Sequence, residues 1–281
     1  MIKVSRLGFA YTAQPFIENM NFEVGDGEIF GFLGPSGAGK STVQKILTGL
    51  ITAYRGSVTV DGMEVKRRDR DYYEKIGVDF EFPSLYEKLS ARENLQFFAS
   101  LYKKQTDIDG HLKSVGLLDD AGKKVAAYSK GMKSRLNFIK ALLHDPAYLF
   151  LDEPTSGLDP QNARQMKDII LDQKARGKTI LLTTHNMYDA TELCDRVAFI
   201  VDGSVRALDT PHHLIMRKGA AKLRYTYDQN GQEKAGEVHL LETGSDDTLL
   251  RLIRENKLTS IHSSEPTLND LFVELTGREL A

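Results

Sequence analysis

The stretch that decides the fold lies at residues 34–42 and reads Gly34-Pro35-Ser36-Gly37-Ala38-Gly39-Lys40-Ser41-Thr42. Its glycines frame a loop whose backbone N–H groups can curl around phosphate oxygens, where a Cβ atom would interfere. Lys40 can reach the β- and γ-phosphates of a nucleotide, and Ser41 offers a hydroxyl to Mg²⁺. The pattern therefore predicts a phosphate-binding loop. The alternative is a glycine-rich turn that contains a lysine by chance.

The residues on both sides of this loop fit the prediction. Residues 28–33 read Glu-Ile-Phe-Gly-Phe-Leu, a short apolar run that predicts a strand entering the loop. From Lys40 onward the apolar residues recur at the spacing of an amphipathic helix, at Val43, Ile46, Leu47 and Leu50. A strand, a glycine loop and a helix N-terminus together place the phosphates where the helix dipole is positive.

A second apolar run ends in two carboxylates. Residues 147–153 read Ala-Tyr-Leu-Phe-Leu-Asp-Glu, which is typical of a parallel strand buried on both faces. Because ligands bind at the carboxyl ends of such strands, we expect Asp152 to hold Mg²⁺, directly or through water. Glu153 would act as the general base toward an attacking water. The alternative for either carboxylate is a helix N-cap before Pro154.

Two further motifs complete an ordered set. Residues 128–132 read Tyr-Ser-Lys-Gly-Met and open an apolar-periodic helix, and residues 183–185 read Thr-Thr-His after a strand expected at 179–182. With these motifs in this order, the chain resembles the nucleotide-binding subunits of ATP-binding-cassette (ABC) transporters over about residues 1–215, and more weakly to its end. Tyr128 and Lys130 depart from the leucine and glycine usual in that family, in a way that resembles bacterial subunits of drug, antibiotic or lipid exporters.

The resemblance implies a Mg²⁺-dependent ATPase whose site residues come from two subunits. Ser129 and Gly131 would face the γ-phosphate bound by the opposite subunit, and Asp159 would couple the two sites. His185 would contact the γ-phosphate and help to hold the attacking water, and Tyr11 would stack on adenine. Taken alone, Ser129 could be an ordinary helix N-cap, His185 a structural histidine and Tyr11 a tyrosine in a β-rich segment.

One position departs from the family in a way that affects the chemistry. Glu81 stands where the family usually has a glutamine that binds Mg²⁺ and faces the membrane subunit. A carboxylate is also a hard oxygen ligand, so Glu81 could hold Mg²⁺ as well. It would add negative charge beside the triphosphate. The alternative is a solvated loop carboxylate.

Composition limits the partners. With 37 Lys+Arg against 39 Asp+Glu and a net charge of −2, the chain has no overall attraction to nucleic acid. The single cysteine, Cys194, excludes an internal disulfide framework. No apolar stretch approaches the roughly 18 residues of a membrane-spanning helix, so membrane attachment is expected to come through a partner.

The resemblance names those partners. It implies transmembrane permease subunits, a second ATPase subunit that is either a copy of this chain or a related cassette, and a place at the cytoplasmic face of the cell membrane. The alternative function is a soluble ABC ATPase that acts as a regulatory switch outside transport. Intact Lys40, Asp152, Glu153 and His185 argue for hydrolysis rather than for ATP binding alone.

We expect an α/β fold: a P-loop NTPase core, an antiparallel β subdomain from residues 1–30 and 56–65, and a helical subdomain at about 84–144. The composition changes after about residue 215, so the cassette is expected at 1–215 and a small α/β accessory domain at 216–281. The accessory domain would contain a hairpin turning at Asn230-Gly231, a helix capped by the stretch Ser245-Asp-Asp-Thr, a strand at 258–262 and a final helix after Pro266.

Overall fold

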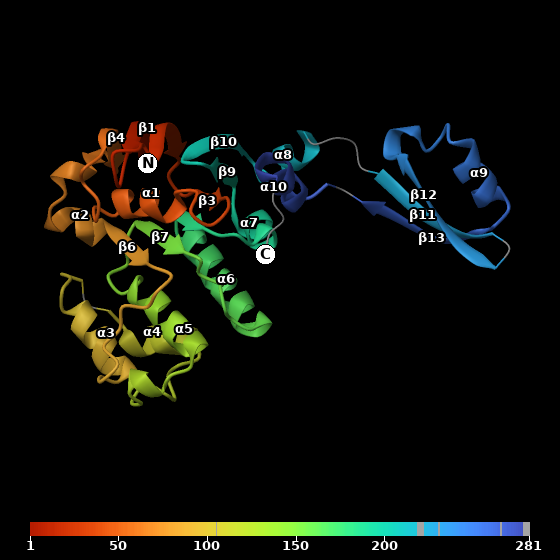
Figure 1. Ribbon diagram of the computed structural model, residues 1–281. Helices are drawn as coiled ribbons and strands as arrows, with labels where there is room; N and C mark the ends of the chain where they lie inside the picture. The colour runs from red at the N-terminus through yellow and green to blue at the C-terminus, as the bar shows by residue number, and fades with distance from the viewer. Residues whose placement is uncertain (105, 218–221, 230, 265, 278–281) are drawn as a thin grey trace. The chain divides into compact units, whose positions relative to one another are not determined.

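The computed structural model describes residues 1–281 except 105, 218–221, 230, 265 and 278–281 (Figure 1). The chain divides into two units, Met1–Thr210 and Pro211–Ala281. The α/β fold predicted from the sequence is confirmed. The domain assignment, with its boundary at about residue 215, stays a prediction.

The first unit contains an antiparallel sheet and a larger, mostly parallel sheet. The antiparallel sheet has the strand order β2-β1-β4-β5, and the six-stranded sheet has the order β10-β9-β3-β8-β7-β6. The strands are β1 (Ile2–Phe9), β2 (Ile17–Val24), β3 (Ile29–Leu33), β4 (Arg55–Val60), β5 (Met63–Glu64), β6 (Ile76–Asp79), β7 (Tyr148–Asp152), β8 (Thr179–Thr183), β9 (Arg196–Val201) and β10 (Ser204–Asp209).

The centre of the larger sheet is parallel because its strands are apolar throughout. Every residue of β3, β7 and β8 is buried, as expected for strands that are covered on both faces. The pairs β3/β8, β3/β9, β7/β8 and β6/β7 are all parallel, and only the edge pair β10/β9 is antiparallel among the described pairs of this sheet. The strands predicted before the glycine loop and before Asp152 are confirmed.

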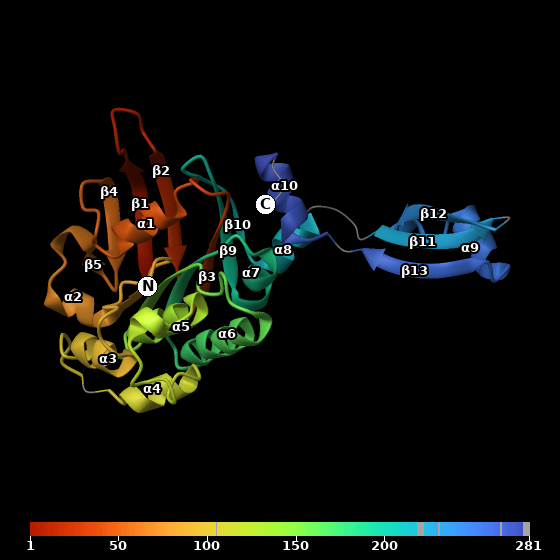
Figure 2. The ribbon, with the colours of Figure 1, turned by 60° about the horizontal axis from the view of Figure 1, so that its bottom comes forward.

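The helices of this unit follow the sheet strands or form a separate group. The unit contains α1 (Lys40–Leu47), α2 (Arg70–Lys75), α3 (Ala91–Ala99), α4 (Ile108–Ser114), α5 (Lys130–Lys140), α6 (Pro160–Ala175) and α7 (Met187–Leu193), with short 3₁₀ turns η1 (Val65–Arg67) and η2 (Val125–Ala127). Figures 1 and 2 show α3 and α4 at the end of the unit opposite β1 and β4. The helices expected at about 84–144 are thus present, joined by long turns.

The second unit contains a small sheet with a helix on one face. Its strands β11 (Lys222–Gln229), β12 (Gln232–His239) and β13 (Leu258–Ser264) are antiparallel in the order β12-β11-β13. The 3₁₀ turn η3 (Leu240–Glu242) and helix α9 (Asp247–Arg254) follow β12, and the unit also contains α8 (Pro211–Arg217) and α10 (Leu268–Thr276). A small core joins sheet and helix, formed by Tyr225, Val238, Leu249 and Leu252.

The elements expected after residue 215 are confirmed where the structure describes them. The hairpin, the strand and the final helix are present, and Asn230 of the expected turn lies outside the described residues. The helix expected after the capping stretch Ser245-Asp-Asp-Thr is present as α9. Within that stretch the cap is Asp246, whose carboxylate accepts the N–H of Leu249 at 2.7 Å.

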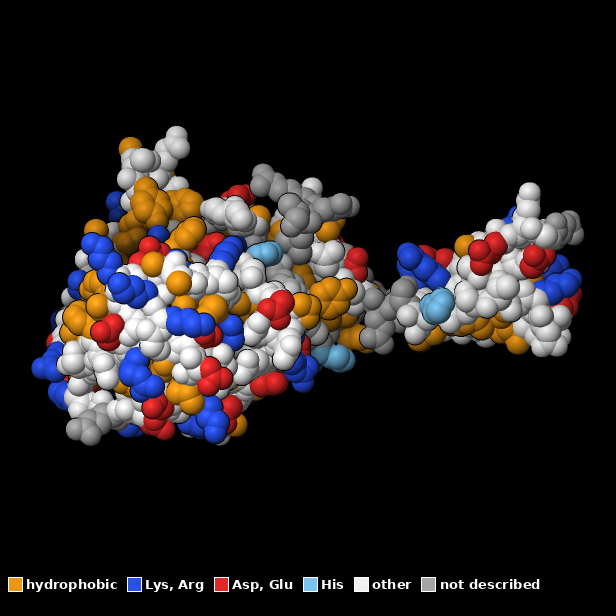
Figure 3. Space-filling model, turned by 90° about the horizontal axis from the view of Figure 1, so that it is seen from below, with side chains coloured by type: hydrophobic (Ala, Val, Ile, Leu, Met, Phe, Trp, Pro, Cys, Tyr) orange, Lys and Arg blue, Asp and Glu red, His pale blue; other side chains and the backbone are white. Residues whose placement is uncertain are grey.

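Charged side chains of both signs are mixed on one face of the first unit. On the face shown in Figure 3, acidic and basic side chains are interspersed over the first unit. Among the described residues, no helix combines the length and the apolar character needed to cross a bilayer.

A buried polar link joins the parallel sheet to α5. Asp79 ends β6 and is 4% exposed, and the Asn137 side-chain amide of α5 donates to its carboxylate. Lys140 Nζ donates to Asn137 Oδ1 at 2.7 Å and to the Ser84 carbonyl oxygen at 3.3 Å. Burial raises the pKa of the Asp79 carboxyl to about 7, although the nearby Lys140 charge and the Asn137 amide oppose the rise.

This pKa predicts how Asp79 affects stability with pH. The folded protein holds the Asp79 proton at pH values where the unfolded chain has released it, so the contribution is complete below about pH 4 and is lost as the pH rises to about 7. Relative to Asp79→Asn, the wild-type free energy of unfolding should fall by about 1 kcal/mol per pH unit in this window and then level off. Urea unfolding at pH 5, 6, 7 and 8 measures it, and parallel curves would contradict the prediction.

Candidate active site

The site lies where neighbouring parallel strands end at one edge of the sheet. In the order β3-β8-β7-β6, these strands lead into the glycine loop, into Thr184-His185, into Glu153 and into the loop that carries Glu81. The register aligns them: Thr183 of β8 lies opposite Phe32 of β3 on one side and opposite Asp152 of β7 on the other. Motifs that are far apart in the sequence therefore meet because they follow the ends of adjacent strands.

The loop at residues 34–42 requires its glycines. Gly34 has φ +148°, and a Cβ there would overlap the Ile200 carbonyl oxygen. Gly39 has φ +112° and is the residue from which α1 begins. Gly37 has φ +79°, and no atom lies within 4 Å of the place its Cβ would occupy. The loop thus leaves open space beside a helix N-terminus, which fits phosphate groups.

Lys40 lies folded against this loop. Its Nζ donates to the carbonyl oxygens of Gly34 at 2.6 Å and Pro35 at 3.1 Å. Burial lowers the pKa of Lys40, and the negative charges of Glu153, Asp152 and Glu81 oppose that change. The ammonium group is thus partly desolvated among carboxylates, and its contacts to two carbonyl oxygens could be exchanged for phosphate oxygens.

Oxygen ligands suited to Mg²⁺ meet beside Lys40. Ser41 Oγ donates to Asp152 Oδ1 at 3.3 Å, and the Thr183 hydroxyl donates to the same carboxylate oxygen. Asp152 is 7% exposed. Its carboxylate accepts these two hydroxyls and does not cap a helix, so the alternative role of Asp152 as an N-cap is wrong. The hydroxyl and the carboxylate are hard donors that fit Mg²⁺ when phosphate oxygens complete the set.

Thr183 is a site residue to which the sequence analysis assigned no role. It was quoted with His185, directly after the strand expected at 179–182. Its hydroxyl contact to Asp152 follows from the opposition of Asp152 and Thr183 in the β7/β8 register. The sequence could have indicated this contact only through the expectation that Asp152 and Thr183 end two neighbouring strands.

Glu153 and His185 are in direct contact. His185 Nδ1 lies 2.9 Å from Glu153 Oε2, with side-chain exposures of 54% and 13%. Glu153 has φ +52°, a left-handed conformation that is unfavourable for a residue with a Cβ, and its N–H donates to the Thr183 carbonyl oxygen at 3.1 Å. Such backbone conformations cost roughly 1–3 kcal/mol and gather at functional sites. Here the turn aims the carboxylate at His185.

Tyr11 lies beside the first turn of α1. Its hydroxyl is 2.9 Å from Thr42 Oγ1, and its ring packs edge-on against Phe9 at 4.7 Å and tilted against Phe16 at 5.5 Å. The ring remains 60% exposed. The structure thus brings Tyr11 to the glycine loop and leaves a surface on which a flat ring can stack.

Ser129, Gly131 and Asp159 lie at the starts of α5 and α6. Ser129 Oγ accepts the Met132 N–H at 3.2 Å, and Asp159 Oδ1 accepts the Asn162 N–H at 3.0 Å. Both are therefore helix N-caps within this chain, and both are exposed. A Cβ on Gly131 would lie 3.6 Å from Leu158 Cδ2, so the two segments are in contact. Their predicted roles toward a second subunit stay predictions.

Glu81 lies in an exposed loop after β6. It is one of the carboxylates whose charge acts on Lys40. Its charge is therefore close enough to affect Lys40, and its role as a Mg²⁺ ligand stays a prediction.

Comparison with known proteins agrees with this geometry. Residues 17–156 match the family model described as ABC transporter. The chain is 52% identical to a fluoroquinolones export ATP-binding protein of Mycobacterium tuberculosis, over 100% of this chain and 94% of the relative. It is 36% identical to Nod factor export ATP-binding protein I of Rhizobium meliloti, over 99% of this chain and 89% of the relative.

A solved structure shares the fold. The ATP-binding subunit of an ABC transporter superposes with a TM-score of 0.72 and 31% identity, over 78% of this chain and 93% of that one. The glycine loop, the paired carboxylates and the histidine thus stand in a chain that is similar along its whole length to ABC ATPase subunits. The chain belongs to the ABC transporter family, as a subunit that binds and hydrolyses ATP.

Proposed function

We propose that ATP hydrolysis at this sheet edge powers an exporter in the cell membrane. The observation that carries the proposal is the Glu153–His185 contact, which lies beside Asp152, Ser41 and Lys40. The relatives named for export support the transport role over a regulatory switch outside transport. We infer that the cargo contacts the membrane subunits rather than this chain.

The residues divide the binding of Mg²⁺-ATP between them. Residues 34–42, with Lys40, hold the β- and γ-phosphates, and Tyr11 stacks on adenine. Ser41 and Asp152 hold Mg²⁺, which neutralises phosphate charge when bound. Lys40 and Ser41 belong to the loop and the first turn of α1, while Tyr11 and Asp152 contact Thr42 and Ser41 beside them.

Glu153 and His185 carry the proton chemistry. Glu153 accepts the proton of the attacking water, because its carboxylate directly follows Asp152, the last residue of β7, which accepts the hydroxyl of Ser41 from the phosphate loop. His185 leaves Glu153 and turns to the γ-phosphate, where it orients the water. The 54% exposure of its side chain supports this movement.

We also propose that two cassettes enclose each nucleotide. Ser129 and Gly131 are at the N-terminus of α5, where unpaired N–H groups favour an anion. Ser129 is exposed and lies on a different segment from the phosphate loop, so it can serve the site of a second chain. Asp159, next to this surface, would couple the two sites at the cytoplasmic face of the membrane.

An apolar groove supports docking of a membrane subunit. The groove has a volume of about 280 Å³ and lies between α3, α5, β6 and the turn after α1. Leu50 and Leu101 line it and remain 63% and 54% exposed, and Phe82 beside Glu81 is 78% exposed. Because exposed apolar clusters mark interaction sites, we propose that a helix of the transmembrane permease subunit fills this groove.

The general-base role predicts the effect of Glu153→Gln. Glutamine keeps the shape but cannot accept the proton, so turnover should fall by at least about 10²-fold while ATP binding persists. ATP-loaded dimers should accumulate in size-exclusion chromatography. The exposed Glu233→Gln is the charge-matched control. Near-normal phosphate release by Glu153→Gln would remove Glu153 from this role.

The ligand role of Glu81 predicts a change in Mg²⁺ dependence. If its carboxylate holds Mg²⁺, Glu81→Gln should raise the Mg²⁺ concentration needed for half-maximal ATPase activity by several-fold. Glu87→Gln, whose carboxylate is 62% exposed nearby, should leave the curve in place. Superimposable titrations of Glu81→Gln and wild type would assign Glu81 to solvent.

The docking proposal predicts a loss of assembly. Leu101→Glu puts a charge into the groove, so co-purification of membrane subunits from detergent-solubilised membranes should fall at least about 10-fold. Intrinsic ATPase activity of the isolated chain should remain. Leu241→Glu, at a position 89% exposed outside the groove, is the control. If Leu101→Glu and Leu241→Glu recover equal amounts of membrane subunit, the contact lies elsewhere. If no membrane subunit co-purifies with the wild-type chain, the regulatory alternative is favoured.

A further inference from the structure

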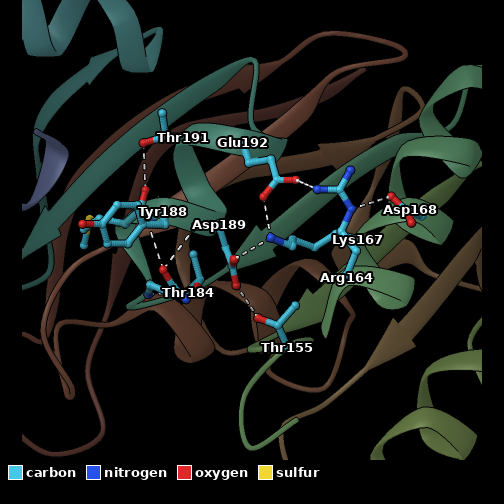
Figure 4. Close-up of polar contacts among 11 residues, drawn as sticks. Thr155, Arg164, Lys167, Asp168, Thr184, Tyr188, Asp189, Thr191 and Glu192 are labelled. Carbon is cyan, nitrogen blue, oxygen red and sulfur yellow. Dashed lines mark hydrogen bonds and ion pairs between the residues drawn. The ribbon is translucent and has the colours of Figure 1, made fainter. Parts of the chain in front are cut away.

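Behind the Glu153–His185 pair, one buried carboxylate joins three segments. Asp189 lies on α7, one helical turn after His185. Its carboxylate accepts the Thr155 hydroxyl at 2.6 Å and pairs with Lys167 of α6 at 3.4 Å (Figure 4). Thr155 belongs to the loop between Glu153 and α6, so the link spans the chain on both sides of the catalytic edge.

The burial of this link makes it persistent. The side chains of Asp189 and Lys167 are 10% and 14% exposed. The pKa of Lys167 is raised, chiefly by its hydrogen bond to Glu192 and also by Asp189. Lys167 keeps Glu192 as a second partner, but the Asp189 carboxylate would be left buried without its charge partner, so the contact is costly for Asp189 to lose.

The start of α7 connects this link rigidly to His185. Asn186 follows His185 directly, and its side-chain oxygen accepts the N–H groups of Tyr188 at 3.0 Å and Asp189 at 3.2 Å. Capping fixes the backbone between His185 and Asp189 in one short turn. A displacement of the backbone at His185 would therefore displace Asp189 or strain this cap.

We propose that Asp189 is a positioning residue that makes the His185 turn and the Glu153–Asp159 loop move as one unit. It touches no substrate. When His185 leaves Glu153 for the γ-phosphate, the Thr155 contact carries the movement to the segment that ends at Asp159. This inference rests on the roles proposed above for Glu153 and His185.

The same polar chain supplies a matched control. From Lys167 it continues through Glu192 to Arg164, which pairs with Asp168 at 3.2 Å (Figure 4). Asp168 is 58% exposed and lies at the outer end. An exposed pair of this kind contributes little to stability, so Asp168→Asn makes the same chemical change where it should have little effect.

The first measurement compares steady-state kinetics. Thr155→Val keeps the side-chain shape, removes the hydroxyl and leaves the Asp189–Lys167 pair intact. It should lower kcat about 10-fold with KM for ATP changed less than 2-fold, because misplacement of the catalytic loop affects the transition state more than ATP binding. Thr155→Ser, which retains the hydroxyl, and Asp168→Asn should stay within 2-fold of wild type.

Asp189→Asn should act in the same direction as Thr155→Val. If Asp189→Asn does not fold, Thr155→Val decides, because it leaves the buried charges paired. Equal kcat for Thr155→Val and Thr155→Ser would overturn the proposal.

The second measurement does not depend on turnover. In a Glu153→Gln background, Mg²⁺-ATP should slow amide hydrogen exchange in both 153–159 and 185–189. With Thr155→Val added, the protection should persist in 185–189 and be lost in 153–159. Two results with Thr155→Val would overturn the proposal. One is faster amide exchange than the background in both segments before ATP is added, and the other is unchanged ATP-induced protection in both segments.

The two proposals fail separately. A Glu153→Gln variant that hydrolyses ATP normally would refute the base assignment. The exchange pattern would still report whether Thr155 and Asp189 join the two segments.

Discussion

The site depends on the lateral pairing of parallel strands that are buried on both faces. An apolar strand such as β8 has no polar face to turn toward water, so it must lie inside the sheet, with β3 and β7 beside it. That pairing puts Thr183 between Phe32 and Asp152 and brings the loops after all three strands to one edge. A one-residue change of register would turn each side chain to the other face of the sheet and separate Ser41 from Asp152.

The charged groups at this edge already have hydrogen-bonding or ion-pair partners within the chain. Lys40 donates to loop carbonyl oxygens, Asp152 accepts two hydroxyls, and Glu153 contacts His185. Phosphate and Mg²⁺ would therefore replace contacts that already exist rather than fill unsatisfied groups. The free energy of binding is then a difference between two sets of contacts, and the left-handed backbone of Glu153 is part of the cost that the fold carries.

Patterns within single segments predicted the secondary structure and the motif residues of those segments. The buried strands, α1 and the residues that follow them were predicted because each motif is continuous in the chain. Contacts such as Asn137–Asp79 and Thr155–Asp189 join residues far apart in sequence, and no spacing within one segment points to them. Ser129 shows a different limit: a serine before a helix serves both as an N-cap and as an anion-binding residue, so its pattern cannot separate the two.

Two buried polar links lead away from the sheet edge. Asp79–Asn137 joins the end of β6 to α5, whose N-terminus carries Ser129, and Asp189–Thr155 joins the His185 turn to the loop that ends at Asp159. Many of the other ion pairs are half exposed or more, and solvent screens them. Charged groups in a dry interior hold their geometry more strictly. In the proposed mechanism the Asp189–Thr155 link carries movement of His185 to the segment that ends at Asp159, whereas the Asp79–Asn137 link holds the end of β6 against α5.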